Sequence, residues 1–304
     1  MNSKLIMNKV IVIVLLLLAL QTTAGTKAKL TAGKKKQTVM LISGAFVTSE
    51  GWGDWKKYFE EKGYDVIVPE WPYKSGPVNV LRERYKEDMT MEYDLKKIVD
   101  YHADLIDKMP QKPILIGHSF GGLIVQLLLQ RNKGAMGIVY HSVPAKGVFV
   151  LKYSFIKSLW GPLGPFRSRK NPFLMSFKQW QYAFTNGMPE TEQKAFYDKL
   201  VVPESRQVLR SALKKQGKID FRKPHAPLLF ISGSTDNIIP ASLNKKNHKR
   251  YIKRQPEGTI TEYKEFEGRN HLAMSQPTWK EDVDYILEWI DKQSDKQQEP
   301  LTQI

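Results

Sequence analysis

Residues 113–128 read PILIGHSFGGLIVQLL, and the pattern changes twice within this stretch. Apolar residues without alternation reach Ile116, a Gly-x-Ser-x-Gly pentapeptide spans 117–121, and apolar residues at helical spacing follow to residue 130. This order predicts a buried strand, a sharp turn and a helix, the setting in which a serine hydroxyl is exposed above a parallel sheet. Glycines at 117 and 121 fit that turn because side chains there would collide with the strand and helix. The alternative is an ordinary glycine-rich turn in which Ser119 has no special role.

The alternation of strands and helices extends in both directions from this stretch. Short apolar segments predict strands at 38–42, 64–69, 113–117, 135–140, 227–231 and 259–266. Helical spacing predicts helices at 52–62, 92–109, 120–130 and 279–291, and the basic run 245–254 is interpreted as one exposed helix face. Strands that are apolar throughout are buried on both faces. We therefore expect an α/β fold with a doubly wound, mostly parallel sheet of about six strands.

One long segment interrupts the alternation. Residues 147–223 contain no clear strand but are rich in aromatic residues. A connection of this length needs structure of its own, so we expect a helical cap insertion. Some of its aromatic residues must form the core of the cap. Others are interpreted as walls of an apolar pocket, with Trp180 and Phe184 as candidate substrate-binding residues.

A serine nucleophile needs a base, and the base needs an acid. His271 follows the last predicted strand directly, and Asp236 lies in the loop after the fifth. No carboxylate follows the fourth strand, where His141 stands instead, so the other expected location of the acid is empty. We predict that Ser119 is the nucleophile, His271 the base and Asp236 the acid, in the chain order expected for this architecture.

Attack on a carbonyl also needs hydrogen-bond donors for the oxyanion. The backbone N–H of Phe120, at the start of a helix, is one candidate. The N–H of Ala45, in the loop that follows the first strand, is the second, although that loop could be a plain glycine turn. Phe46 and His118 stand beside these donors and complete the set of candidate substrate-binding residues.

Composition excludes several classes of function. The 304 residues are 41% hydrophobic, which suffices for one sizeable domain, and carry a net charge of +16. The chain has no cysteine, which excludes disulfides, thiolate catalysis and cysteine-bound metal. It shows neither clustered metal ligands nor a phosphate loop, so we expect no metal and no cofactor. The lysine-rich runs lack interleaved aromatic residues, so we expect no nucleic-acid partner, while weak contact with an anionic membrane surface stays open.

The two ends of the chain differ from the rest. Residues 1–24 combine two lysines, an eleven-residue apolar run and small residues before position 25, which predicts a signal peptide and an exported protein, periplasmic or secreted. Residues 25–36 are predicted to form a basic flexible arm, residues 37–292 the folded domain and residues 293–304 a polar tail.

The elbow at 117–121, the acid loop at 233–240 and the Gly-x-x-His sequence at 268–271 together resemble the α/β-hydrolase superfamily, in particular its small esterase- and lipase-like serine hydrolases with a helical lid. The resemblance covers residues 37–292. It implies hydrolysis of a small-molecule ester with an apolar acyl or aryl group through an acyl-enzyme. Acyl transfer, lyase chemistry and a non-catalytic ligand-binding role on the same scaffold are the alternatives. Two features depart from the pattern: Ser43-Gly44 stands where many relatives carry His-Gly, and the predicted sheet begins at the third of the usual eight strands.

Overall fold

A computed structural model describes residues 36–87, 93–164 and 171–298. The predicted signal peptide at 1–24 and nearly all of the basic arm lie outside the described residues. The chain separates into two compact units, residues 1–37 and 38–304, and the second unit contains the elements described below. Among the described residues, no helix has the length and apolar character that a membrane crossing requires.

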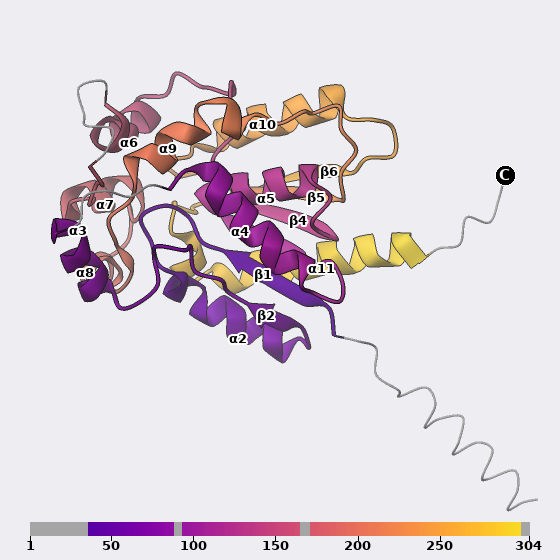
Figure 1. The fold of residues 1–304 in the computed structure, drawn as a ribbon, viewed down its shortest axis with the longest axis horizontal. Coiled ribbons are helices and arrows are strands. Elements are labelled where there is room, and N and C mark those ends of the chain that lie inside the picture. The colour runs from indigo at the N-terminus through magenta and orange to yellow at the C-terminus, as the bar shows by residue number, and fades with distance from the viewer. Residues whose placement is uncertain (1–35, 88–92, 165–170, 299–304) are drawn as a thin grey trace, which may run out of the picture. The chain divides into compact units, whose positions relative to one another are not determined.

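The second unit is built on one parallel sheet (Figure 1). Its strands are β1 (Thr38–Ile42), β2 (Asp65–Ile67), β3 (Ile114–His118), β4 (Met136–Tyr140), β5 (Leu228–Gly233) and β6 (Thr261–Phe266). They lie in the order β2-β1-β3-β4-β5-β6, and every neighbouring pair is parallel. The chain therefore moves outward from β1 to β2 and then returns to the other side of β1. In open parallel sheets, ligands bind beyond the carboxyl ends of the strands at such a reversal point, here between β1 and β3.

The register brings the ends of the central strands together. Ile42 pairs with Gly117, and Gly117 pairs with Val139. The loops after β1, β3 and β4 thus start side by side. The residues of β3, β4 and β5 are buried throughout, as the unbroken apolar runs predicted.

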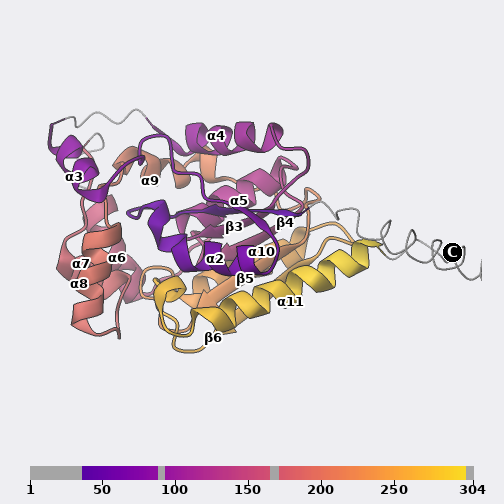
Figure 2. The same ribbon diagram turned by 90° about the horizontal axis from the view of Figure 1, so that it is seen from below.

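Helices cover both faces of the sheet (Figures 1 and 2). One face carries α2 (Gly53–Glu61) and α11 (Trp279–Gln298), which are linked by the hydroxyl of Tyr58 donating to Asp284 at 2.7 Å. The other carries α4 (Leu95–Asp107), α5 (Phe120–Gln130) and α10 (Ala241–Arg254). There Asn247 of α10 donates to Gln126 of α5 at 2.9 Å, and both residues are buried. The doubly wound fold predicted from the sequence is confirmed.

The segment between β4 and β5 forms a helical cap at one end of the sheet. It contains α6 (Tyr153–Leu163), α7 (Phe177–Ala183), α8 (Glu190–Leu200), α9 (Arg206–Ala212) and the 3-10 turn η2 (Lys215–Gly217). Figure 2 shows α6, α7 and α8 gathered beyond the strands together with α3 (Val78–Glu87). Single antiparallel bridges, Val47 with Val201 and Phe173 with Glu204, are the isolated strand-like contacts of the described residues. The first of them connects the cap to the loop after β1.

Three features differ from the sequence prediction. The helix predicted at 92–109 begins at Leu95, where the side chain of Asp94 accepts from the backbone N–H of Lys97 and ends the preceding loop. The mostly polar helix α3 was not predicted; its buried residues Leu81 and Tyr85 are only one turn apart. The stretch predicted as a polar tail at 293–304 begins within α11, which continues to Gln298; Gln293 is buried, and its amide donates to Glu262 of β6 at 3.4 Å.

Candidate active site

Ser119 lies in a strained turn between β3 and α5. Its φ of 55° and ψ of −117° place a non-glycine residue in a sparsely populated region. The turn is tight because the two glycines allow close approach of backbone: a Cβ on Gly117 would lie 2.3 Å from the carbonyl oxygen of Gly121, and one on Gly121 would lie 2.2 Å from that of Ile42. The backbone of Ser119 is fixed by donation to the carbonyl of Tyr140 at 3.0 Å. The strain is thus held by contacts on both neighbouring strands.

Three side chains from distant parts of the sequence meet at the carboxyl edge of the sheet. The hydroxyl of Ser119 lies 2.9 Å from Nε2 of His271, and Nδ1 of His271 lies 2.7 Å from Oδ2 of Asp236. A carboxylate can only accept, so Nδ1 carries the proton and Nε2 is left to accept from the serine hydroxyl. This is the tautomer that a histidine needs to act as a base toward a serine.

The carboxylate of Asp236 is fully hydrogen-bonded. Oδ1 accepts from the backbone N–H groups of Ile238 at 3.0 Å and Ile239 at 2.7 Å. Oδ2 accepts from His271 and also from Nδ1 of His141, which lies 2.8 Å away. Four donors therefore hold this buried carboxylate in one orientation, and two of them are imidazoles.

His141 was not assigned to this constellation from the sequence. The signal that could have found it is its place directly after β4, at the edge where Ser119 and Asp236 also stand. Its φ of 50° and complete burial show that the chain holds it in an unusual conformation to reach Asp236. Its Nε2 is buried and has no hydrogen-bond partner among the described residues.

Burial and neighbouring charge move the pKa values of the site in opposite directions. Burial lowers the pKa of His271 and Asp236 raises it, while His141 also lowers it; the result lies below the ordinary value of 6.5. Burial alone would raise the pKa of Asp236, but His271 and the hydrogen bonds from both imidazoles outweigh it, and the pKa falls below its usual range. At neutral pH the site therefore holds an ionised carboxylate and a neutral imidazole, poised to accept a proton.

His141, Asp236 and His271 could in principle hold a metal ion. Each offers one ligand atom, and these atoms lie within 4.8 Å of one another. The arrangement of these atoms fits hydrogen bonds from the two imidazoles to the carboxylate better than it fits a metal site. Nδ1 of both histidines faces the same carboxylate oxygen at hydrogen-bond distance, and a cation there would have to displace both protons.

The loop after β1 passes directly beside the serine. A Cβ on Gly44 would lie 2.8 Å from the Cβ of Ser119, which explains why glycine occupies this position. Among the described residues, neither the N–H of Ala45 nor that of Phe120 donates to a protein acceptor. Phe120 is the first residue of α5, where helix geometry leaves N–H groups without an intrahelical partner. The two predicted oxyanion donors thus flank Ser119 and are available to a bound group.

A buried ion pair between Lys74 and Glu204 holds the loop after β1 in place. Nζ of Lys74 lies 2.5 Å from Oε2 of Glu204 and donates to the carbonyl of Gly44 at 3.2 Å. Glu204 also accepts from the backbone N–H of Phe46 at 3.1 Å and from the hydroxyl of Tyr73 at 2.7 Å. The side chains of Lys74 and Glu204 are 3% and 0% exposed, so the pair is shielded from solvent. Nothing in the local sequence signals this contact, because its partners lie 130 residues apart.

Of the predicted substrate-binding aromatics, Phe184 contacts His271 directly, and Trp180 and Phe46 pack against Phe184. The ring of Phe184 meets the imidazole edge-on, with the ring centroids 4.6 Å apart, and stacks on Trp180 at 4.7 Å. Phe46 packs edge-on against Phe184 at 6.3 Å. All three rings are buried. Trp180 also donates to the carbonyl of Gln193, so it belongs to the core of the cap.

His118 lies behind the site. Its Nε2 donates to the backbone carbonyl of His271 at 2.8 Å, and its ring is buried between Trp52 and His271. Burial and the neighbouring histidines lower the pKa of His118 well below its ordinary value, so it stays neutral. This position fixes the His271 loop and gives no side-chain contact with the cavity described next.

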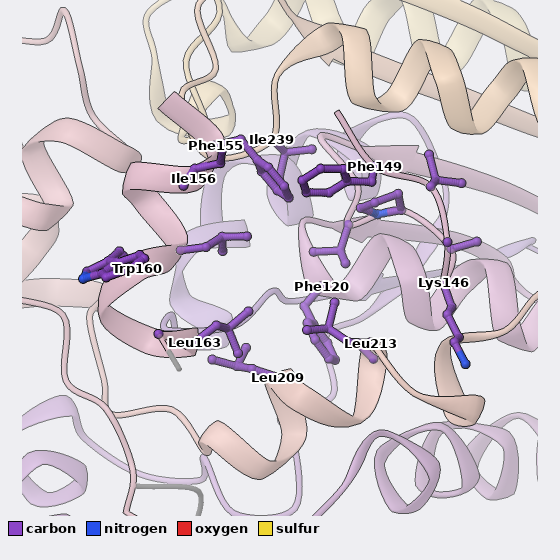
Figure 3. A pocket seen from close by; sticks show the side chains of 18 residues that line it. Phe120, Lys146, Phe149, Phe155, Ile156, Trp160, Leu163, Leu209, Leu213 and Ile239 are labelled. Carbon is purple, nitrogen blue, oxygen red and sulfur yellow. The ribbon is translucent and has the colours of Figure 1, made fainter. Parts of the chain in front are cut away.

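An apolar cavity of about 490 Å³ opens between the cap and the sheet (Figure 3). It is lined by α6, α9 and the loop after β4, and Phe120 and Ile239 connect it to the site: Phe120 follows Ser119, and the N–H of Ile239 binds Asp236. Among the lining residues Lys146 is the charged one, and Figure 3 shows its ammonium group pointing away. Neither Ser119 nor the predicted aromatics Phe46, Trp180 and Phe184 line it. The described conformation is closed over Ser119, which is 5% exposed.

Comparison with known proteins agrees with this architecture. A pyrethroid hydrolase from Sphingobium faniae is 17% identical, with 84% of this chain and 98% of that chain covered and a TM-score of 0.61. A methylesterase from Arabidopsis is 15% identical, with 84% of this chain and 99% of that chain covered and a TM-score of 0.60. A monoacylglycerol lipase from Paleococcus ferrophilus is 18% identical, with 84% of this chain and 94% of that chain covered and a TM-score of 0.59. Likeness at these identities shows the shared fold. No curated protein sequence matches. The alpha/beta hydrolase family, in contrast, matches residues 39–280, and because this match spans most of the sequence, the chain belongs to that family.

Proposed function

We propose that this alpha/beta hydrolase is a serine esterase that cleaves carboxylic esters through an acyl-enzyme. The observation that carries the proposal is the continuous hydrogen-bonded line from the Ser119 hydroxyl through His271 to Asp236, at 2.9 and 2.7 Å. A neutral imidazole within hydrogen-bond reach of a serine in a strained turn is the arrangement that converts a weak hydroxyl nucleophile into a reactive one.

Each residue has a role in the proposed reaction. The oxygen of Ser119 attacks the ester carbonyl as Nε2 of His271 takes its proton, and Asp236 stabilises the resulting imidazolium. The carbonyl oxygen becomes an oxyanion held by the N–H groups of Ala45 and Phe120. Collapse expels the alcohol, which receives the proton from His271. Water then repeats the sequence on the acyl-enzyme and releases the acid.

The buried ion pair strengthens one of these donors. Lys74 donates to the carbonyl of Gly44, and this carbonyl belongs to the same peptide unit as the N–H of Ala45. A cation on the carbonyl side of an amide polarises that amide, which makes its N–H a better donor to a negative oxygen. Lys74 is therefore a positioning and polarising residue in this proposal and does not touch the substrate.

The cavity supports an apolar acyl or aryl substrate. Its wall is almost entirely hydrocarbon and it begins at Phe120, whose N–H is one of the two proposed oxyanion donors. A substrate carbonyl between Ala45 and Phe120 would place one arm of the ester toward this cavity. The proteins of similar fold include a pyrethroid hydrolase, a methylesterase and a monoacylglycerol lipase, which is compatible with such a substrate.

Three measurements test the proposal. Ser119→Ala should abolish turnover of short p-nitrophenyl esters while circular dichroism and the melting temperature stay unchanged. A fluorophosphonate probe should label the wild-type chain and should not label Ser119→Ala. Undiminished turnover by the folded Ser119→Ala variant would remove Ser119 from the mechanism, and absence of labelling in the wild type would favour the non-catalytic ligand-binding alternative. Product analysis with competing alcohol acceptors separates hydrolysis from acyl transfer.

A further inference from the structure

The rim of the apolar cavity exposes an unusual set of side chains. Leu151 is 85% exposed, Tyr153 74%, Trp160 58% and Phe149 48%, and all four lie within one short stretch of the cap. Leu213 of the neighbouring α9 segment is 61% exposed. We call these five residues the apolar rim. Single exposed apolar residues are normal on soluble proteins, whereas a contiguous group marks an interaction site.

The rim surrounds the mouth of the cavity. Phe149, Trp160 and Leu213 line the cavity wall and are also exposed to solvent, so they form its border (Figure 3). Leu151 and Tyr153 stand between Phe149 and Trp160 in the sequence and do not line the cavity. These two side chains therefore extend outward from the border and have no packing role inside it.

Cationic side chains flank the rim. Nζ of Lys246 donates to the backbone carbonyl of Phe149 at 2.7 Å, and the guanidinium of Arg250 donates to that of Gly147 at 2.6 Å. Nζ of Lys157 lies 5.7 Å from the ring centroid of Tyr153. Lys146 and Lys152 are exposed within the same stretch. The cations are thus anchored next to the apolar residues.

The segments that carry these cations have no acidic residues of their own. Residues 141–189, 205–219 and 237–256, which supply most of the cavity wall and its flanks, contain no Asp or Glu at all. The chain has 31 acidic residues, and their absence from these three segments leaves each segment with a net positive charge. A surface with an apolar centre and a purely cationic border is complementary to an apolar layer covered by anions.

We propose that the apolar rim docks on an anionic lipid bilayer. Leu, Trp, Phe and Tyr side chains insert at the level of the head groups, where aromatic rings are favoured, and the flanking lysines and arginines contact anionic head groups. A protein partner would have to match both the hydrocarbon and the charge of this surface, and a second copy of the chain would place two cationic borders against each other. The bilayer satisfies both requirements at once.

Docking would bring the cavity mouth against the lipid. Delivery of a bilayer-dissolved ester to Ser119 in this way rests on the proposed function, whereas the binding of the rim to lipid does not. The test therefore measures binding separately from turnover.

The experiment is co-sedimentation of the purified chain with vesicles of phosphatidylcholine alone or of phosphatidylcholine mixed with phosphatidylglycerol. The wild type should pellet with the mixed vesicles, remain in the supernatant with phosphatidylcholine, and be partly released by high salt. Leu151→Ser/Tyr153→Ser should bind the mixed vesicles roughly ten-fold more weakly, and Lys146→Glu/Lys152→Glu should lose the preference for them. Val80→Ser, at a site 45% exposed on α3, is the matched control and should bind like the wild type.

Several outcomes overturn the inference. One is a wild type that stays in the supernatant with mixed vesicles, and another is a Leu151→Ser/Tyr153→Ser variant that binds like Val80→Ser. A third is a wild-type dimer in analytical ultracentrifugation that becomes monomeric in Leu151→Ser/Tyr153→Ser, which would assign the rim to a second copy of the chain. Turnover of a short, water-soluble ester by Leu151→Ser/Tyr153→Ser distinguishes these failures from failure of the proposed function, because neither residue lines the cavity.

Discussion

The proposed catalytic edge of the sheet and the apolar rim of the cap are built in opposite ways. At the edge, Ser119, Asp236 and His271 are buried, and their polar atoms are matched by donors and acceptors that follow the ends of neighbouring strands. At the rim, large side chains such as Leu151 stand in solvent on a segment inserted between β4 and β5. Under the proposed function, this contrast means that the sheet sets the chemistry and the insertion sets which substrates reach it. Changes at the edge should alter rates for all substrates, and changes at the rim or cavity should alter selectivity.

The largest effect is expected from Asp236→Asn. The amide can occupy the same space, but it favours the wrong tautomer of His271, so kcat should fall about 10⁴-fold with little change in KM. Steady-state turnover of a short p-nitrophenyl ester measures the loss. Asp220→Asn, at an exposed aspartate, is the control and should keep wild-type turnover. Comparable kcat values for the two variants would remove Asp236 from the mechanism.

The second-largest effect, on the free energy of unfolding, is expected from loss of the Lys74–Glu204 ion pair that holds the loop after β1. Lys74→Met leaves the carboxylate of Glu204 buried without its cationic partner, which should reduce the free energy of unfolding by about 3–5 kcal/mol. Lys56→Met removes an ion pair with Glu60 whose side chains are 43% and 42% exposed, and should cost at most about 1 kcal/mol. Urea denaturation of both variants makes the comparison. Equal losses would mean that the buried pair has no special weight.

A variant at His141 tests whether the hydrogen bond from this residue to Asp236 matters for turnover, apart from the burial of its side chain. His141→Phe removes one charge-assisted hydrogen bond to Asp236, an interaction of roughly 1.5–3 kcal/mol, so kcat should fall about ten- to hundred-fold. Because His141 contributes to the low pKa of His271, its loss should also move the acid limb of the pH–rate profile to higher pH. The wild type should retain half its maximal rate at a pH below 6.5, since activity needs the neutral imidazole.

Two variants control this experiment. His141→Asn keeps a donor at the same place and should restore part of the rate. His102→Phe replaces a histidine that is equally buried in α4 and contacts the carbonyl of Ile98, so it should change stability without moving the pH profile. A profile that shifts equally in His102→Phe and His141→Phe would contradict a direct role of His141 at Asp236.

The smallest effect on turnover of a short p-nitrophenyl ester is expected from a substitution in the cavity wall. Leu159 lines the cavity, and Leu159→Trp should fill part of it. The apolar contacts of a long acyl chain would then be lost, so kcat/KM for long acyl esters should fall by roughly ten-fold relative to short ones. Leu174→Trp, at an exposed position of the cap outside the cavity, should leave the ratio unchanged. An identical chain-length profile for both variants would show that the acyl group binds elsewhere.

Local patterns were sufficient to predict the fold and part of the candidate site. The apolar runs of β3, β4 and β5 and the glycines around Ser119 carry their structural reason in the sequence itself, and the loops after β5 and β6 place Asp236 and His271 by topology. The contacts of Lys74 with Glu204 and of His141 with Asp236 depend on the packing of segments far apart in the chain, which no local pattern encodes. The prediction of Trp180 as a pocket wall did not anticipate its place in the core of the cap.

The contacts between the cap and the loop after β1 have a mechanical consequence. Val202 donates to the carbonyl of Phe46 at 2.8 Å, and Thr48 donates to that of Leu200 at 3.1 Å, so the stretch after α8 is tied to the same loop that carries Ala45. Movement of this stretch away from the sheet would break both hydrogen bonds and displace the loop that holds the proposed oxyanion donor. The part of the cap that follows α8 is therefore a fixed anchor for that loop.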